Sequence, residues 1–144
     1  MKSYRLGDPA SGVLPDFGKR GFHKGEHVPE VAELLALLER ITTARTCRKD
    51  FLDDELFSDP AWDMLIHLFH ADLSGYRLTV TNLASASGVP YTTALRWMDT
   101  LIEKGLASRT QNPLDRRSVF MEISETARAS MYDYLCRVWV NYYA

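Results

Sequence analysis

The hydrophobic period of the chain changes at Gly105, and this change restricts the possible folds more than any other feature. Before Gly105, the run TTALRWMDTLIEK has apolar residues at helical spacing, which we expect to face inward: Ala94, Trp97 or Met98, Leu101 and Ile102. After it, LASRT and SVFMEI alternate with a period of two on either side of QNPLDRR, which predicts a β-hairpin. A short helix over VTNLASAS, with Thr79 as a candidate N-cap, ends at Gly88, and Pro90 opens the next helix. The order is therefore helix, turn, helix and hairpin.

Three further helices are predicted around this unit. The first covers about residues 29–53, begins near Pro29 and has one apolar stripe: Val31, Leu34, Leu35, Leu38 and Ile41. The second follows the candidate caps Ser58 and Asp59, runs to Gly75 and is expected to bury Trp62, Leu65, Ile66 and Phe69. The third is capped by Ser124 and runs to about Tyr142, while YRLTV is a candidate third strand. These elements predict a mainly helical α+β fold.

Composition and length indicate one globular domain. The chain has 144 residues, of which 46% are hydrophobic and 25% charged. Residues 1–27 contain five of the eight glycines and no apolar period, which predicts a flexible tail before a single domain at 28–144. The net charge of −2 gives no overall attraction to nucleic acid, but residues 90–117 carry +2 against −4 for the rest of the chain. Positive charge is thus concentrated in the helix and hairpin.

Two motifs with the correct spacing make residues 58–124 resemble the winged-helix regulators of the MarR family. DTLIEKGL is similar to the end of the family's recognition helix, and DRR followed by SVFMEIS is similar to its wing tip and return strand. One difference is Ala127, where the family often has glycine. The resemblance implies a homodimeric transcription regulator, with dimerisation helices at 28–57 and 125–144 around a DNA-binding winged helix. A recognition helix at about 90–104 would enter the major groove, and a wing at about 106–123 the minor groove.

The residues expected to contact double-stranded DNA lie on the polar face of the recognition helix and at the wing tip. They are Tyr91, Thr92, Thr93, Arg96, Thr100, Lys104, Arg116 and Arg117. Arg117 is the candidate for the minor groove, and Asp115 is expected to orient it or its neighbour by a charge-assisted hydrogen bond. Taken alone, a charged hairpin tip is usually only solvated, and Arg96 and Lys104 would more often pair with acidic neighbours on the helix. The joint pattern favours DNA binding over these alternatives.

A homodimer is predicted from the last helix, which is apolar on two faces. Met131, Tyr134, Leu135, Val138 and Tyr142 form one stripe, and Tyr132, Cys136, Trp139 and Tyr143 form another. Because one small core cannot cover both faces, we expect a two-fold interface with the first helix. Its residues would be Leu34, Leu38, Met131, Tyr134, Leu135, Val138, Trp139 and Tyr142. The alternative is a terminal helix packed within its own monomer.

Other kinds of site are less well supported. His67 and His70 lie three apart on a helix, but nothing nearby completes a metal site, so no metal is expected. Cys47 is either a redox sensor or an idle thiol, and idle is the safer interpretation. No phosphate-binding loop or nucleophile elbow occurs, so we expect neither an enzyme nor a cofactor; whether a small-molecule effector exists stays open.

The location and the main functional alternative also follow from the sequence. Only two cysteines occur, the start lacks a signal-peptide pattern and no run of about 18 apolar residues is present, so we expect a cytoplasmic protein without membrane association. The alternative function is a winged-helix protein-interaction module without DNA binding. Such a module would not need basic residues at positions 96, 104, 116 and 117.

Overall fold

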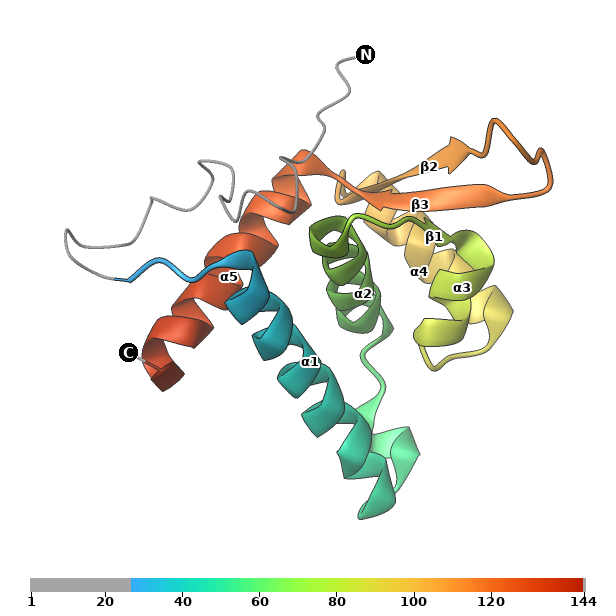
Figure 1. The fold of residues 1–144 in the computed structure, drawn as a ribbon. Helices are drawn as coiled ribbons and strands as arrows, with labels where there is room; N and C mark the ends of the chain where they lie inside the picture. Colours follow the sequence, from blue (N-terminus) through green and yellow to red (C-terminus); the bar gives the residue numbers. More distant parts are fainter. Residues whose placement is uncertain (1–26, 144) are drawn as a thin grey trace.

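The computed structural model describes residues 27–143, without the side chains of Glu55, Tyr142 and Tyr143. The predicted tail at 1–27 therefore lies outside the described residues, apart from His27. Figure 1 shows the elements in chain order. They are α1 (Val31–Cys47), the 3₁₀ turns η2 (Arg48–Asp50) and η3 (Asp54–Phe57), α2 (Pro60–Ser74), β1 (Leu78–Thr79), α3 (Val80–Ala86), α4 (Tyr91–Glu103), β2 (Ala107–Gln111), β3 (Val119–Ile123) and α5 (Glu125–Tyr143).

The three strands form one small antiparallel sheet in the order β1-β3-β2. The hairpin pairs Ala107 with Ile123 at its base and Gln111 with Val119 near its tip. Strand β1 adds only two residues, with Leu78 opposite Met121. The mainly helical α+β class and the hairpin predicted from the change of period are confirmed.

Local signals set the ends of several helices as predicted. The Thr79 hydroxyl accepts a hydrogen bond from the Asn82 backbone N–H at 3.1 Å, and Ser124 Oγ accepts one from the Ala127 N–H at 3.1 Å. Gly105 follows α4 with φ at +71°, a left-handed conformation that glycine adopts without steric cost. This residue lets the chain reverse from α4 into β2.

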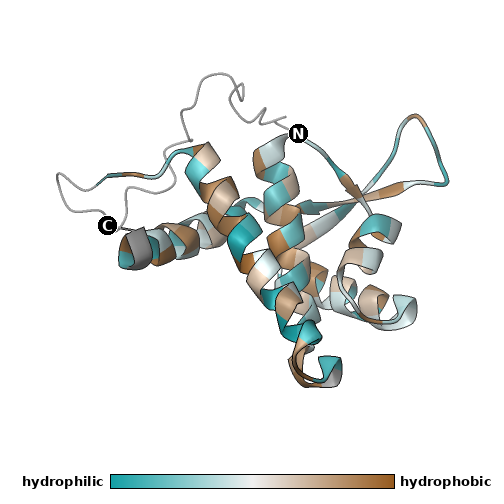
Figure 2. Cartoon of the chain, turned by 60° about the horizontal axis from the view of Figure 1, so that its bottom comes forward, coloured by the Kyte–Doolittle hydropathy of each residue, from teal (hydrophilic) through white to brown (hydrophobic). Residues whose placement is uncertain are grey.

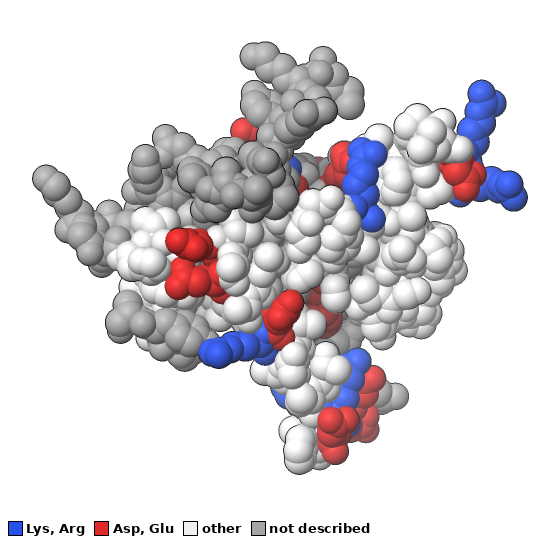
Figure 3. Space-filling model, viewed as in Figure 1, with Lys and Arg blue, Asp and Glu red and all other residues white. Residues whose placement is uncertain are grey.

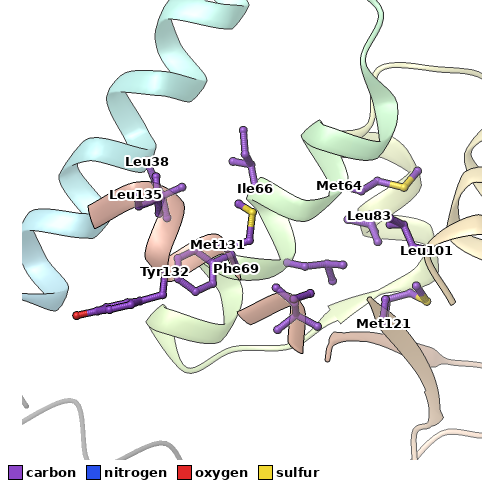
Figure 4. Close-up of a cluster of buried hydrophobic side chains, with 14 of the residues drawn as sticks. Leu38, Met64, Ile66, Phe69, Leu83, Leu101, Met121, Met131, Tyr132 and Leu135 are labelled. Atoms are coloured by element: carbon purple, nitrogen blue, oxygen red, sulfur yellow. The ribbon is translucent and has the colours of Figure 1, made fainter. Parts of the chain in front are cut away.

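One hydrophobic core joins all the helices to the inner face of the sheet. Figure 4 shows side chains from α1, α2 and α5 meeting on one side, and side chains from α3, α4 and β3 on the other. Phe69 of α2 is fully buried between them. Ion pairs support this packing: Arg128 of α5 donates two hydrogen bonds to Asp72 of α2, at 2.7 and 2.9 Å, and Arg45 of α1 pairs with Asp63 of α2 at 2.8 Å.

The structure corrects three details of the predicted elements. Helix α1 ends at Cys47 rather than near residue 53, because residues 42–47 contain three threonines and no large apolar residue, and Phe51 and Leu52 beyond them do not pack on the core. Of the two alternatives in α4, Met98 is buried and Trp97 is partly exposed. In α2, Trp62 and Leu65 are only half-buried. Among the described residues, no helix has the length and apolar character needed to cross a bilayer.

Candidate nucleic-acid interface

Helix α4 presents a polar face to solvent because its apolar residues recur at helical spacing. Ala94, Met98 and Leu101 are buried on the inner side. On the opposite side Tyr91, Thr92, Arg96 and Lys104 are exposed, while Thr93 and Thr100 are half-buried. The hydroxyl of Thr100 donates a hydrogen bond to the Arg96 carbonyl oxygen at 3.1 Å, so this group is already used within the helix. The free donors on α4 are thus concentrated in its first half and at Arg96 and Lys104.

The wing, residues 112–118, is held by a network of turn hydrogen bonds. The Asn112 N–H donates to the Ser118 carbonyl oxygen at 3.0 Å, and the Asn112 side chain accepts from the Leu114 N–H at 2.9 Å. The Gln111 side-chain amide donates to the carbonyl oxygens of Arg116 and Ser118, at 2.6 and 3.3 Å. The backbone of this loop therefore has a defined conformation although its side chains project into solvent.

Asp115 organises the wing tip mainly through the backbone. Its Oδ1 accepts a hydrogen bond from the Arg117 N–H at 3.0 Å, and its carbonyl oxygen accepts from the Ser118 N–H at 3.0 Å. The Arg117 guanidinium lies 3.8 Å from the same carboxylate, but the Arg117 side chain is 96% exposed. An ion pair so exposed contributes little, so Asp115 fixes the turn that presents Arg117 rather than the guanidinium itself. Figure 3 shows the basic side chains projecting from the wing at the upper right.

A groove of about 370 Å³ separates the start of α4 from the wing. Its polar lining residues come from the β1–α3 junction, α4, β2 and the wing: Thr79, Thr81, Tyr91, Arg109, Asp115, Arg117 and Ser118. Val80, Leu95 and Val119 form the apolar part of the lining. The groove thus brings together residues that are up to 40 positions apart in sequence.

Arg109 is a residue that the sequence prediction missed. It lies on β2, lines the groove and pairs with Asp99 on α4 at 2.8 Å, which joins strand β2 to helix α4. The sequence did contain a sign of its involvement, because Arg109 is one of the five basic residues between positions 90 and 117. The period-two pattern alone could not show that its partner is an acid ten residues earlier on the helix.

The predicted dimerisation residues fall into two groups. Leu34 and Leu38 of α1 and Met131 and Leu135 of α5 are buried in the core of the single chain, whereas Val138 and Trp139 are half-buried and Tyr134 is 44% exposed. The side chain of Tyr142 lies outside the described part. The Tyr134 ring also packs edge-on against Trp62 of the same chain, with 5.0 Å between centroids.

The premise that one core cannot cover both faces of the last helix is wrong for the part of α5 that ends at Cys136. Tyr132 and Cys136, from the second stripe, are also buried inside the chain. Helix α5 packs against both α1 and α2, and buried residues of both stripes belong to the same hydrophobic core. Burial raises the pKa of the Cys136 thiol to about 11, so this group stays neutral. The apolar side chains of α5 that stay partly exposed include Tyr134, Val138 and Trp139.

The histidines and Cys47 do not form a site. Within the described residues no group of three potential metal ligands occurs. Burial lowers the pKa of His67, an effect that nearby Asp63 partly opposes, and His67 lines a cavity of only about 80 Å³ beside Gly88. Ligand sites are commonly about 300 Å³ or larger, so this cavity gives no support for an effector. Cys47 is exposed at the end of α1.

The succession of α3, a tight turn, α4 and the β2–β3 hairpin is a winged helix-turn-helix, in which α4 occupies the place of the recognition helix. Residues 75–119, which contain this unit from β1 to the start of β3, match the family model of the MarR family. The match confirms the resemblance predicted from the DTLIEKGL and DRR motifs.

Several solved structures are similar to this chain at low sequence identity. AF1382 from Archaeoglobus fulgidus is similar with a TM-score of 0.50 and 12% identity, over 67% of this chain and 99% of that chain. MepR from S. aureus, in a complex with DNA, has a TM-score of 0.48 and 13% identity over 77% of this chain and 83% of its own. A probable transcriptional regulator from Pseudomonas aeruginosa has a TM-score of 0.46 and 17% identity, with coverages of 77% and 79%. No curated protein sequence matches the chain.

Proposed function

We propose that the protein is a homodimeric transcription regulator that binds specific duplex DNA through α4 and the wing. The observation that carries the proposal is the groove with donors on both sides, Tyr91 and Thr81 on one and Arg109, Arg117 and Ser118 on the other. An α-helix about 10–12 Å in diameter fits the B-DNA major groove, which is about 12 Å wide. When α4 lies in the major groove and the wing in the next minor groove, the sugar–phosphate strand between these two DNA grooves passes through the groove on the protein.

The two elements have different tasks in this arrangement. Arg96 is exposed on α4 and can donate two hydrogen bonds to a guanine edge, which reads sequence. Arg117 extends from the wing tip, where a minor groove with negative potential attracts a guanidinium. Lys104 is exposed at the end of α4 and is suited to a phosphate contact, which positions the protein without reading bases. Arg109 is paired with Asp99, so its main task is to hold β2 against α4.

A dimer is the second part of the proposal. The exposed ring of Tyr134 and the half-buried Val138 and Trp139 leave apolar surface on the later part of α5. Apolar surface next to a hydrophobic core is typical of an interface between identical subunits. Two recognition helices related by a two-fold axis would read an inverted repeat with half-sites about 34 Å apart, or one helical turn. We expect such a regulator to act in the cytoplasm.

Two measurements on the intact protein test the proposal. Selection from random duplexes should yield an inverted repeat, and sedimentation at micromolar concentration should give a dimer. If no duplex is retained even at low salt, DNA binding is not the function, and the winged-helix interaction module becomes the better interpretation. A monomer that selects a single, unrepeated site would remove the dimer and leave DNA binding intact.

A further inference from the structure

The connection between α1 and α2, residues 48–59, carries a group of large apolar side chains that no residue of the described part covers. Phe51 is 84% exposed, Leu56 70% and Leu52 57%. In Figure 1 this connection forms the lower end of the molecule, well separated from the wing and from the C-terminal end of α5. Figure 2 shows apolar residues at its tip. A cluster of exposed apolar residues at one place marks an interaction surface more often than scattered ones do.

This connection is ordered, so the exposure is a property of its structure. The N–H groups of Phe51 and Leu52 both donate to the Arg48 carbonyl oxygen, at 3.2 and 3.0 Å, and the Leu56 N–H donates to the Asp53 carbonyl oxygen at 3.1 Å. Two further contacts close the turn. The Lys49 ammonium lies 3.0 Å from the Asp54 carboxylate, and the Arg48 guanidinium lies 4.5 Å from the centre of the Phe57 ring. The backbone that carries the apolar side chains therefore has a defined conformation, which reduces the entropy lost on binding.

The charge around these side chains limits what can bind them. Residues 48–59 contain five acidic and two basic residues. Figure 3 shows acidic side chains at this end of the molecule beside uncharged surface. Duplex DNA and anionic lipid surfaces are both negative and would be repelled. A protein surface with an apolar pocket and a rim of lysine or arginine is complementary in both respects.

We propose that residues 48–59 form a docking surface for a partner protein whose apolar pocket has a basic rim. Phe51 and Leu56 enter the pocket as anchors, with Leu52 beside them, and Asp50 faces the rim. The proposal does not require that the protein bind DNA. It also places the partner on a different part of the molecule from α4, the wing and the later part of α5.

A displayed library of random peptides, each about a dozen residues long, provides the probe for this surface. The library is selected on the intact wild-type protein, and the selected peptides are then measured by fluorescence anisotropy. We expect peptides that combine lysine or arginine with leucine or aromatic residues, and binding that weakens as salt increases. The variant F51S/L52S/L56S should bind them at least about tenfold more weakly, since buried anchors carry most of the energy of an interface. L114S removes a 95% exposed leucine from the wing and should leave their binding unchanged.

Controls separate this inference from folding defects and from the proposed function. The replaced side chains are exposed, so thermal unfolding should match the wild type in every variant. Binding to the selected duplex should match the wild type in the variants of residues 48–59, which lie away from α4 and the wing. Asp50→Lys keeps the apolar side chains and should still weaken the basic peptides, which tests the surface if the triple variant unfolds. The proposal is overturned if no peptides are enriched, if they are not basic, or if the triple variant binds them like the wild type. It is also overturned if the triple variant converts a dimer into a monomer, because a second copy then covers the surface.

Discussion

Removing the two wing-tip arginines should change the salt dependence of DNA binding by a calculable amount. Arg116 and Arg117 are both exposed, and the nearest carboxylate to the Arg117 guanidinium is the one at 3.8 Å on Asp115. Because the ion pair between Arg117 and Asp115 is exposed to solvent and weak, the Arg117 guanidinium remains available to a phosphate or a minor groove. The double variant R116A/R117A therefore removes cations that release counterions when they meet DNA.

The magnitude follows from the cations that the structure leaves available on this face. Each subunit offers Arg96, Lys104, Arg116 and Arg117 as exposed groups, whereas Arg109 is already paired with Asp99 at 2.8 Å. A dimer that uses three or four of them per subunit neutralises about 6 to 8 phosphates, which gives a slope of log K against log salt of about −5 to −7. Removal of two per subunit should make this slope less steep by about 3 to 4.

Fluorescence anisotropy of a labelled duplex over a series of salt concentrations measures both slopes. Arg137→Ala is the matched control, because Arg137 is an exposed arginine on α5 away from α4 and the wing. Its loss should leave the slope unchanged, provided that sedimentation shows the same oligomeric state as the wild type. Circular dichroism shows whether each variant keeps its fold. The reasoning is refuted if the wild-type slope is near zero, or if R116A/R117A weakens binding with no change of slope.

Three further perturbations address base reading, the core and pH. Arg96→Ala should change the preferred base at one position of the selected site by about 1 to 3 kcal/mol, whereas Lys104→Ala should weaken all sites alike; an unchanged site would make Arg96 a phosphate contact. Arg128→Ala leaves the carboxylate of Asp72 largely buried without its partner and should lower the free energy of unfolding in urea by about 2 to 3 kcal/mol, and no change would show that this pair is not structural. Burial lowers the pKa of His67 below its usual 6.5, so the unfolded state takes up the proton first and stability falls as pH drops below about 6.5; His67→Asn should lose less stability between pH 7.5 and 5.5, and equal losses would contradict this role.

The sequence alone determined the features of this protein that depend on residues close together in the chain. The caps at Thr79 and Ser124 and the reversal at Gly105 each involve residues within a few positions, and all were predictable from capping and turn chemistry. The helix-turn-helix and the hairpin follow from the change of period, for the same reason. The polar face of α4 follows too, because burial of one side of a helix leaves the other side to solvent.

Tertiary structure decided the features that depend on which surfaces meet. The apolar stripes of α5 could not show that α1 and α2 of the same chain would cover both Leu135 and Cys136. The pairing of Arg109 with Asp99 needs the sheet to lie against α4, and the end of α1 depends on where the core ceases to offer apolar contact. Periodicity states that a face is apolar, but the element that covers it is chosen by the packing of the whole chain.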